Sequence, residues 1–389
     1  METREKIQQV RGKIVAVIDM KILHITPGFY PTVGGIQKYI EDLCIGLNKL
    51  GHQSDVITFD RHTVTGEKYE RHELYRGINI YRLPFINLKY YHIITNIPRI
   101  LSIARQYDII HIYGIGPFTD LFYLTRKIHR KPVVLSTVGG PFHTKNLSLI
   151  KNTYFDTWNR MSLKKISKIV AISDHDKRLF SRISKNIELI PVPVELDKFK
   201  FHERKKSNLA MICIGRISKN KRIDRLIDVV KILASDEPHT KLYVIGRGPK
   251  SLWDSLKAYA ISSGVEKNVE FVGEASDEKM LECMKKSTFF LSASEYESFG
   301  ISAVEAMAAG LIAVLNGIDS FKYFVKNGEN GFIVDFSKPE EVASLITKLN
   351  KTDISSISLK AHERVGEFEP ENIVSSMEKL YKKIAMQRV

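Results

Sequence analysis

The sequence contains no apolar run of the roughly 20 residues that a membrane-spanning helix needs, and no low-complexity tract. Its first residues are polar and of mixed charge, without the apolar segment of a secretory signal peptide. Only three cysteines occur, far apart and in apolar surroundings, so they provide neither a disulfide framework nor a zinc site. These absences predict a globular protein of the reducing cytoplasm.

Acidic residues are under-represented relative to basic ones. Lys and Arg number 59 against 44 Asp and Glu, which gives a net charge of +15. A surplus of this size favours anionic partners such as phosphates, acidic lipids or nucleic acid. Because the chain carries no recognisable DNA- or RNA-binding motif, we expect no nucleic-acid partner. A basic nucleic-acid-binding protein is kept as the alternative from another class, which a gel shift in physiological salt tests.

Short apolar runs alternate with amphipathic segments along the 389 residues. Near-continuous apolar strands separated by helices predict parallel sheets that are covered on both faces. The amphipathic segments have helical spacing, as in the apolar stripe of residues 223–233. The predicted strands are 21–26, 54–59, 78–84, 107–114, 131–137, 168–173, 187–192, 210–215, 241–246, 269–273, 287–294, 311–316 and 331–336.

The segment 190–208 separates two such halves, because it holds two prolines followed by a strongly basic polar stretch. We therefore predict an α/β protein of two doubly wound domains, with the boundary near residue 198. Ligands of such folds lie at the carboxyl ends of the strands. The expected parts are an arm with a possible extra strand (1–19), two domains (20–198 and 199–368) and a last helix (369–389).

Two loops at strand ends have the composition of phosphate sites. Gly34 and Gly35 precede a helix, so backbone N–H groups can approach an anion there, although a plain turn is the alternative. In the stretch CIGRISKNKRIDRL, Arg216 and Lys221 flank a loop after the strand that ends at Gly215. An arginine fork and a lysine point charge can hold a diphosphate from two sides, whereas a solvated basic turn is the alternative.

A third loop carries the stretch ESFGISAVE, in which Glu297 precedes a helix and Glu305 lies about two turns inside it. Eight residues of helix span on the order of 12 Å, roughly the length of a nucleotide-sugar from hexose to ribose. One carboxylate can therefore bind sugar hydroxyls while the other binds the ribose. Backbone N–H groups between them, at Phe299, Gly300 and Ile301, are placed to meet a pyrophosphate.

The double glycine, GRISKNK and ESFGISAVEAMAAG occur in this order in one chain. Together they resemble the family 4 retaining glycosyltransferases of the GT-B fold, from about Met20 to the last helix. The resemblance implies two Rossmann-like domains that face a cleft, an N-terminal acceptor domain and a C-terminal nucleotide-sugar domain. It also implies that the last helix crosses back onto the N-terminal domain.

The resemblance implies a role for each of these side chains. Glu297 would contact the hydroxyls of the donor sugar, and Glu305 the ribose. Arg216 and Lys221 would neutralise the diphosphate and stabilise the leaving group. The donor-binding set is completed by residues whose backbone approaches the donor, namely Gly34, Gly35, Gly215, Gly246, Gly273, Phe299, Gly300 and Ile301.

The stretch LSTVGGPFHTKNL resembles a Thr-His-Gly-Gly-Phe-Phe-His-Thr pattern of polysaccharide mannosyltransferases in this family. Val138 stands in place of the first histidine, and Pro141 in place of the first phenylalanine. We nominate His143, which keeps the second histidine, as the catalytic substitute; a surface histidine is the alternative. Because the first imidazole is missing, the protein could also be a degenerate transferase that serves only as a binding subunit.

The implied chemistry needs no cofactor besides the donor, a GDP- or UDP-linked hexose. The one Asp-x-Asp sequence before residue 200, in the stretch SDHDKR (173–178), is typical of a helix start, and no cluster of metal ligands is evident, so we expect transfer without a metal. Arg216 and Lys221 would supply the electrostatic stabilisation that a metal gives elsewhere. The expected step is attack of an acceptor hydroxyl on C1 with retained configuration, the leaving phosphate taking the proton.

The segment 145–168 contains six Lys or Arg residues against one acidic residue, with Tyr154, Phe155 and Trp158 between them. A basic segment with aromatics suits anionic lipid headgroups. We therefore expect a peripheral enzyme at the cytoplasmic face of the membrane that acts on a lipid-linked or growing glycan. The alternatives are a solvated basic face and a soluble acceptor.

Overall fold

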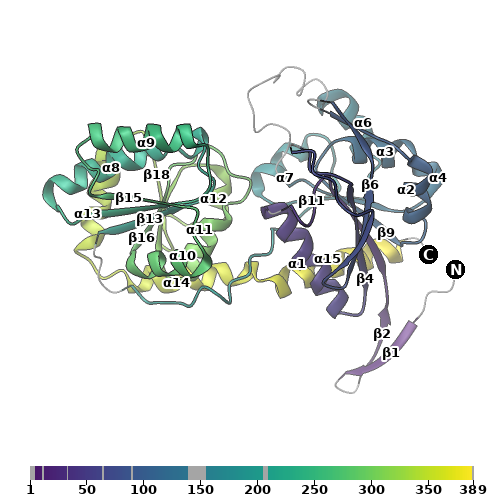
Figure 1. Ribbon diagram of the computed structural model, residues 1–389. Helices are drawn as coiled ribbons and strands as arrows, with labels where there is room; N and C mark the ends of the chain where they lie inside the picture. Colours follow the sequence, from purple (N-terminus) through teal and green to yellow (C-terminus); the bar gives the residue numbers. More distant parts are fainter. Residues whose placement is uncertain are drawn as a thin grey trace. The chain divides into compact units, whose positions relative to one another are not determined.

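The computed structural model describes residues 5–10, 13–32, 34–63, 65–88, 91–138, 155–204 and 209–387. Contacts divide the chain into two compact units (Figure 1). Unit 1 comprises Met1–Pro193 and Pro370–Val389, and unit 2 comprises Val194–Glu369. The division falls a few residues before the predicted boundary near residue 198.

Unit 1 is built on an eight-stranded sheet in the order β12-β11-β10-β9-β3-β4-β6-β5. All neighbouring strands are parallel except β5, which pairs antiparallel with β6 at one edge. Four of the five residues of β3 are buried, as a strand covered on both faces requires. The strands are β3 (Lys21–Ile25), β4 (Gln53–Phe59), β5 (His72–Tyr75), β6 (Ile78–Leu83), β9 (Ile109–Tyr113), β10 (Val133–Ser136), β11 (Lys168–Ala171) and β12 (Ile187–Leu189).

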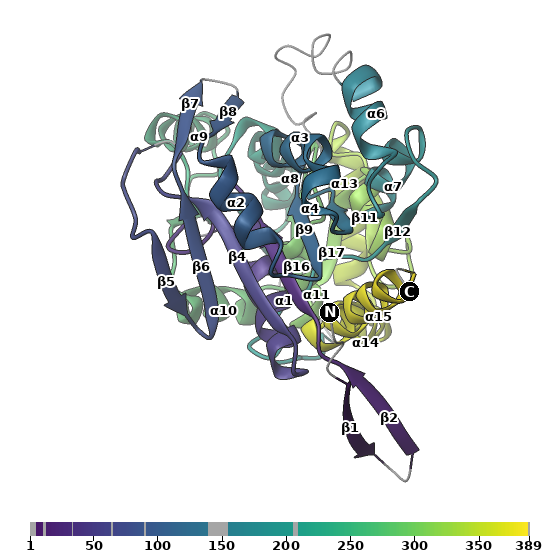
Figure 2. The ribbon, with the colours of Figure 1, turned by 90° about the vertical axis from the view of Figure 1, so that its right-hand side faces the viewer.

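Helices cover this sheet, and two hairpins form separate two-stranded sheets (Figure 2). The first lies within residues 1–19, where a possible extra strand was expected, and the sequence pattern did not predict the second. The hairpins are β1 (Glu5–Val10) with β2 (Lys13–Ile18), and β7 (Phe85–Leu88) with β8 (Tyr91–Ile94). Ser173 caps α7 by accepting a hydrogen bond from the N–H group of Asp176. The helices are α1 (Gly35–Lys49), α2 (Ile97–Ala104), α3 (Pro117–Leu124), α4 (Arg126–His129), a π-helix (Phe155–Asn159), α6 (Arg160–Leu163), α7 (Asp174–Ser181) and α15 (Pro370–Met386).

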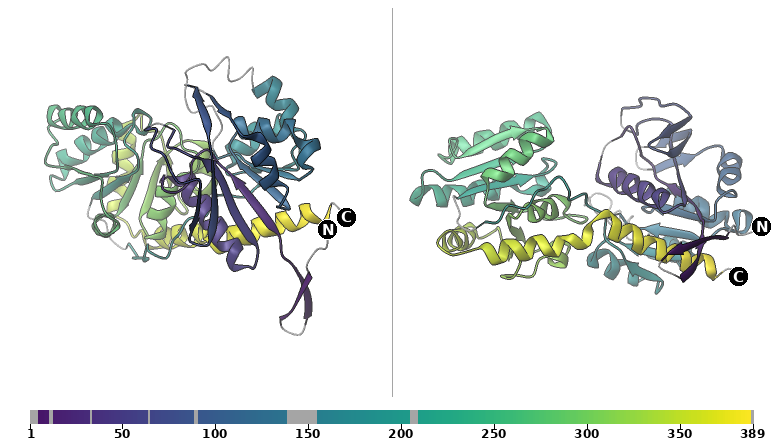
Figure 3. Two further views of the ribbon diagram at one scale, coloured as in Figure 1. Left: turned by 45° about the vertical axis from the view of Figure 1, so that its right-hand side comes forward. Right: turned by 90° about the horizontal axis from the view of Figure 1, so that it is seen from below.

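The last helix, α15, belongs to unit 1 although it follows the whole of unit 2 in sequence, and it runs along α1 (Figure 3). A side chain at Gly46 of α1 would overlap Val374 of α15, so this glycine permits the close approach of the two helices. His52 Nε2 lies 2.9 Å from Glu378 Oε1, and His111 Nδ1 lies 2.6 Å from the Tyr381 hydroxyl. The expected return of the last helix onto the N-terminal domain is confirmed.

Unit 2 is built on a six-stranded parallel sheet in the order β15-β14-β13-β16-β17-β18. Its strands are β13 (Ala210–Ile214), β14 (Lys241–Ile245), β15 (Val269–Gly273), β16 (Phe289–Ser292), β17 (Ile312–Asn316) and β18 (Phe332–Val334). Its helices are α8 (Ile223–Asp236), α9 (Lys250–Ser262), α10 (Asp277–Lys286), α11 (Ile301–Ala308), α12 (Asp319–Phe324), α13 (Pro339–Asn350) and α14 (Ser355–Val365), with 3₁₀ turns at Lys219–Lys221 and Gly366–Phe368.

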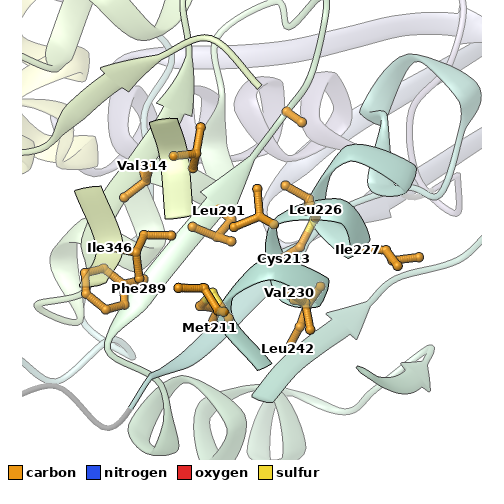
Figure 4. Packing of buried hydrophobic residues seen from close by; sticks show 14 of the residues in the cluster. Met211, Cys213, Leu226, Ile227, Val230, Leu242, Phe289, Leu291, Val314 and Ile346 are labelled. Atoms are coloured by element: carbon orange, nitrogen blue, oxygen red, sulfur yellow. The ribbon is translucent and has the colours of Figure 1, made fainter. Parts of the chain in front are cut away.

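The core of unit 2 joins the predicted stripe of α8 to the central strands (Figure 4). Leu226, Ile227 and Val230 are fully buried, as the helical spacing of the apolar residues predicts. They pack against side chains of β13, β14 and β16. Burying each of these side chains stabilises the fold by about 1.5–3 kcal/mol. This packing holds the carboxyl ends of β13 and β16 rigidly in place.

Candidate active site

The strand order of unit 2 reverses between β13 and β16. From β13 the chain adds β14 and then β15 on one side, and later places β16, β17 and β18 on the other. The loops that leave β13 and β16 therefore diverge at the carboxyl edge of the sheet. In doubly wound sheets, ligands bind in the crevice at this reversal. The two loops are the predicted stretches GRISKNK and ESFG.

Lys221 and Glu297 meet at this reversal. Lys221 Nζ lies 2.5 Å from Glu297 Oε1, and both side chains are more than four-fifths buried. The same carboxylate oxygen accepts a hydrogen bond of 2.8 Å from the hydroxyl of Ser294, a residue with no exposed surface. Glu297 is therefore held from two sides. The structure thus brings together two side chains that stand 76 residues apart in the sequence.

Asn220 ties the two loops to each other. Its carbonyl accepts a hydrogen bond of 3.0 Å from the N–H group of Glu295, and its side-chain amide donates one of 2.7 Å to the carbonyl of Tyr296. Asn316, at the end of β17, donates to the carbonyl of Ser294 at 3.0 Å. These bonds fix the backbone on both sides of Glu297. The sequence interpretation missed them because it weighed only the charges of these loops.

The cations of the first loop divide into paired and unpaired ones. Arg222 forms ion pairs with Asp224 at 2.7 Å and with Glu295 at 2.8 Å, so its charge is already compensated by these two carboxylates. Arg216 is exposed and makes no hydrogen bond or ion pair with the residues that the structure describes. It lines a cavity of about 790 Å³ that is bounded by residues 216–219 and 247–255. A volume of this size accommodates a nucleotide, since small-molecule sites occupy roughly 300–1,000 Å³.

Three glycines lie next to one another at the ends of β13, β14 and β15. The N–H group of Gly215 donates to the carbonyl of Ile245 at 3.0 Å, and that of Gly246 to the carbonyl of Gly273 at 2.7 Å. All three have positive φ angles. A Cβ atom at Gly246 would overlap the carbonyl oxygen of Gly215. Gly246 therefore lets the ends of β13 and β14 pack closely, whereas a Cβ atom at Gly273 would meet nothing within 4 Å.

Helix α11 begins at the reversal as predicted. Gly300 is its N-cap, with φ of 102°, and no side chain caps the free N–H groups. A Cβ atom at Gly300 would lie 2.7 Å from the Phe321 ring, so the position requires glycine. Phe299 is buried against Phe324 and Phe368, and its side chain is structural. The backbone from Phe299 to Ile301 is thus free to present N–H groups to an anion.

Both halves of the chain match family models of glycosyltransferases. Residues 33–198 match the model described as Glycosyltransferase Family 4, and residues 194–368 match that of Glycosyl transferases group 1. A mannosyltransferase of Komagataeibacter xylinus, "GDP-mannose:cellobiosyl-diphosphopolyprenol alpha-mannosyltransferase", is 31% identical over 321 residues, which cover 81% of this chain and 80% of that protein. The chain belongs to the family 4 glycosyltransferases. A protein of Xanthomonas campestris with the same description is 29% identical over 336 residues, covering 85% of this glycosyltransferase and 87% of that protein.

Solved structures confirm the fold. HepE of Anabaena, solved in complex with UDP and glucose, superimposes with a TM-score of 0.72 at 18% identity, covering 94% of this chain and all of that chain. The predicted GT-B class of this glycosyltransferase is therefore correct. The family prediction, made from the double glycine and the two loops of unit 2, is confirmed as well.

Glu305 is the fifth residue of α11 in the glycosyltransferase, so it lies about one turn inside the helix rather than the predicted two. Residues 297–300 are not helical, so the expected span of eight helical residues between Glu297 and Glu305 is wrong. Burial, together with nearby Asp277, raises the pKa of its carboxyl to about 7, and Lys198 opposes the rise only in part. Lys198 is itself paired with Asp277 at 3.0 Å. Near neutral pH this carboxyl is therefore partly protonated, so it can both donate and accept a hydrogen bond at a hydroxyl.

We expect Glu305→Gln to flatten the pH dependence of stability. The folded pKa of about 7 lies above the ordinary value of 4.5, so this group's contribution is fully present below pH 4.5 and is lost as pH rises through 7. The free energy of unfolding of the wild type should fall by up to about 3 kcal/mol more than that of the variant between pH 4.5 and 8. Denaturant titrations at several pH values measure this, with Glu266→Gln, an exposed site, as control. Parallel pH profiles for wild type and Glu305→Gln would contradict it.

The remaining predicted site residues lie in unit 1. Gly34 is the N-cap of α1 with an extended backbone, and Gly35 is the first helical residue. A side chain at Gly34 would meet only the flexible end of Gln37, so unlike Gly246 it is not required by packing. His143 lies outside the described residues. Val138, where a histidine was expected, is buried with φ of 35°.

The described part of the chain contains neither a cluster of metal ligands nor a membrane-spanning helix. No group of three or more His, Cys, Asp or Glu residues in the described ranges is arranged to hold a metal ion. Over the same residues, every helix is too short or too polar to cross a bilayer.

Proposed function

We propose that this protein transfers mannose from GDP-mannose to a hydroxyl of a lipid-linked saccharide, with retention of configuration. The observation that carries the proposal is the Lys221–Glu297 pair at the strand reversal of a family 4 glycosyltransferase. The choice of donor and acceptor is supported by the descriptions of the relatives in Komagataeibacter xylinus and Xanthomonas campestris. UDP-hexoses and soluble acceptors are the competing substrates.

The proposed donor lies with its diphosphate between Arg216 and the first turn of α11. Lys221 and Arg216 neutralise charge on the departing phosphate, and the N–H groups from Phe299 to Ile301 add partial positive charge. Glu297 accepts hydrogen bonds from the sugar hydroxyls, while Ser294 keeps its carboxylate in place. Because Lys221 now bonds Glu297, donor binding must insert the sugar and phosphate beside this ion pair or divide it.

The proposed transfer uses no metal and no nucleophilic side chain. The acceptor hydroxyl attacks C1 of the mannose on the face from which the phosphate leaves. A phosphate oxygen takes the proton of the hydroxyl as the C1–O bond to the nucleoside diphosphate breaks. The products are an α-mannoside and GDP, in which the former bridging oxygen carries the charge that Lys221 and Arg216 stabilise.

We further propose that unit 1 docks on the anionic cytoplasmic face of a membrane. The hairpin β7–β8 and helices α3, α4 and α6 lie on one side of the sheet in Figure 2. They expose large apolar side chains, which are Ile86, Leu88, Ile93, Leu124, Ile128 and Met161. Exposed cations accompany them at Arg126, Lys127, Arg130, Arg160, Lys164 and Lys165. Apolar and basic groups together suit anionic headgroups.

Trp158 does not take part in this surface as the sequence suggested. Its indole N–H donates to Asp120 at 2.7 Å and its ring packs edge-on against Tyr123. Residues 145–154 of the predicted basic segment lie outside the described ranges.

One assay tests substrate, mechanism and location. The protein is incubated with GDP-mannose and cellobiosyl-diphosphopolyprenol in vesicles containing phosphatidylglycerol, with UDP-glucose and free cellobiose as comparisons. We expect an α-mannosylated lipid product, undiminished by EDTA, and protein that floats with these vesicles but not with neutral ones. A β-linked product contradicts retention. Transfer only from UDP-glucose, or only to free cellobiose, contradicts the assigned substrates.

A further inference from the structure

A second cavity lies in unit 1, outside the carboxyl ends of strands β3 and β4. It has a volume of about 190 Å³ and is lined by residues 27–29 after β3, residues 58–63 at the end of β4, Gln37 of α1, and Thr32 and Tyr69. Its volume lies below the roughly 300–1,000 Å³ of drug-sized sites, so it suits a single small ring. Parallel α/β sheets bind ligands at this edge.

Thr58 gives this cavity an unsatisfied polar group. The side chain is 2% exposed, and its Oγ1 has no hydrogen-bond partner among the residues that the structure describes. By contrast, the buried hydroxyl of Thr26, at the end of the neighbouring strand, donates to the carbonyl of Gly28 at 3.1 Å. An unpaired buried hydroxyl costs roughly 1–3 kcal/mol, which a water molecule or a ligand in the cavity would recover by hydrogen-bonding to it.

The charges around the cavity favour a neutral ligand. Arg61 is the cation of its lining, and its guanidinium is 2.9 Å from Asp60 and lies over the ring of Phe85. The positive charge is thus compensated within the fold. The other polar and aromatic residues of the lining are Thr32, Thr58, Thr63, Gln37, His62, Phe29, Phe59 and Tyr69. Hydroxyls and amides beside aromatic faces bind a sugar ring better than a phosphate.

We infer that this cavity holds a neutral sugar ring of the acceptor saccharide, and that Thr58 Oγ1 hydrogen-bonds one of its hydroxyls. The inference rests on the proposed function, since it assigns the acceptor's place in that reaction. Thr58 acts as a specificity-determining residue, because a ring that lacks the matching hydroxyl leaves the threonine unpaired. Gln37 donates to the carbonyl of Gly28 at 3.3 Å and so holds the loop after β3 against α1.

The test is Thr58→Val, which removes the hydroxyl and keeps the shape of the side chain. We expect the KM for cellobiosyl-diphosphopolyprenol to rise about tenfold, as loss of one buried hydrogen bond implies, with kcat changed less than twofold. The midpoint of thermal unfolding should stay the same or rise, because the removed hydroxyl has no partner among the described residues of the free protein. An unchanged KM, or a lowered unfolding midpoint with unchanged KM, overturns the assignment.

Thr119→Val is the matched control. Thr119 is also a buried threonine of unit 1, but its hydroxyl donates to the carbonyl of Gly114 at 3.0 Å. Its replacement should lower the unfolding midpoint and leave the KM for the acceptor unchanged. A tenfold rise in KM in this variant as well would show that the Thr58 effect is not local.

Ligand binding without turnover separates this inference from the proposed function. Saturation-transfer NMR with free cellobiose should detect binding to the full-length wild type and a loss of signal in Thr58→Val. Thermal shift with GDP reports the donor site of unit 2 and should be the same in both proteins.

If GDP binds and cellobiose binding is independent of Thr58, the assignment of the cavity is wrong but the donor site is supported. If cellobiose binding depends on Thr58 while neither GDP nor GDP-mannose binds, the proposed function is contradicted but the assignment of the cavity as a sugar site is supported. Cellobiose binding that inorganic phosphate displaces contradicts a neutral-sugar site.

Discussion

Replacing Lys221 with alanine is expected to lower kcat for mannosyl transfer by about 10³-fold. The ammonium group is the cation nearest to Glu297, and removing a preorganised charge that stabilises a leaving group costs transfer on this scale. Stability should change less, by about 3 kcal/mol or less, because the pair is mostly buried but Glu297 keeps its hydrogen bond from Ser294. The measurements are kcat from product formation and the unfolding free energy from denaturant titration.

Lys231→Ala controls for the loss of one positive charge. Lys231 is exposed on α8, the helix that follows the Lys221 loop, and its removal should change kcat less than twofold. A Lys221→Ala enzyme with wild-type kcat would contradict the site. A loss of kcat that follows a loss of folded protein would assign Lys221 a structural role instead.

Replacing Gly246 with alanine is expected to destabilise unit 2 by more than about 4 kcal/mol. The new Cβ atom would overlap the carbonyl oxygen of Gly215, a backbone atom that cannot rotate away. Relief requires separating β13 from β14, which breaks the bond from Gly215 N–H to Ile245 and disturbs the one from Gly246 N–H to Gly273. The φ angle of 150° adds strain for any residue with a side chain.

Each unit contains one of the two tryptophans, which allows the unfolding of unit 2 to be measured alone. In a Trp158→Phe background, fluorescence reports on Trp253, which packs edge-on against Phe271 in unit 2. Gly264→Ala is the control, since Gly264 has φ of 74° but open space around it, and should cost about 1 kcal/mol. If both variants lower the free energy of unfolding of unit 2 equally, backbone strain alone explains the destabilisation of Gly246→Ala and overlap with Gly215 does not.

Regular patterns made most of the fold predictable. The apolar stripe of α8 and the buried strands of both sheets follow directly from their spacing, because burial on one helix face or on both sheet faces dictates it. Strand β5 and the hairpin β7–β8 escaped prediction. The residues of β5 alternate between exposed and partly buried, and three of the four residues of β7 are exposed, because an edge strand or surface hairpin imposes no continuous apolar run.

The site was predictable where a residue's type reveals its chemistry. Lys221, Glu297, Arg216 and the glycines at strand ends are cations, carboxylates and flexible residues in loops, and each suggests a ligand on its own. Ser294 and Asn220 gave no such signal, since serines and asparagines are common in loops for reasons of turn geometry. Their importance lies in their partners, Glu297 and the carbonyl of Tyr296, which are distant in sequence.

The sequence alone determined the family, the two α/β units and the identity of the charged and glycine residues at strand ends, because period and composition are local properties of the chain. Only the tertiary structure decided that Lys221 pairs with Glu297, that Arg222 is committed to Asp224 and Glu295, and that Gly246 is needed for packing. It also decided that the Thr58 hydroxyl, which lies beside a cavity, has no hydrogen-bond partner in the part of the chain that the structure describes. These facts depend on which atoms meet across the sheet, and the order of strands that brings them together is set by long-range packing rather than by any local pattern.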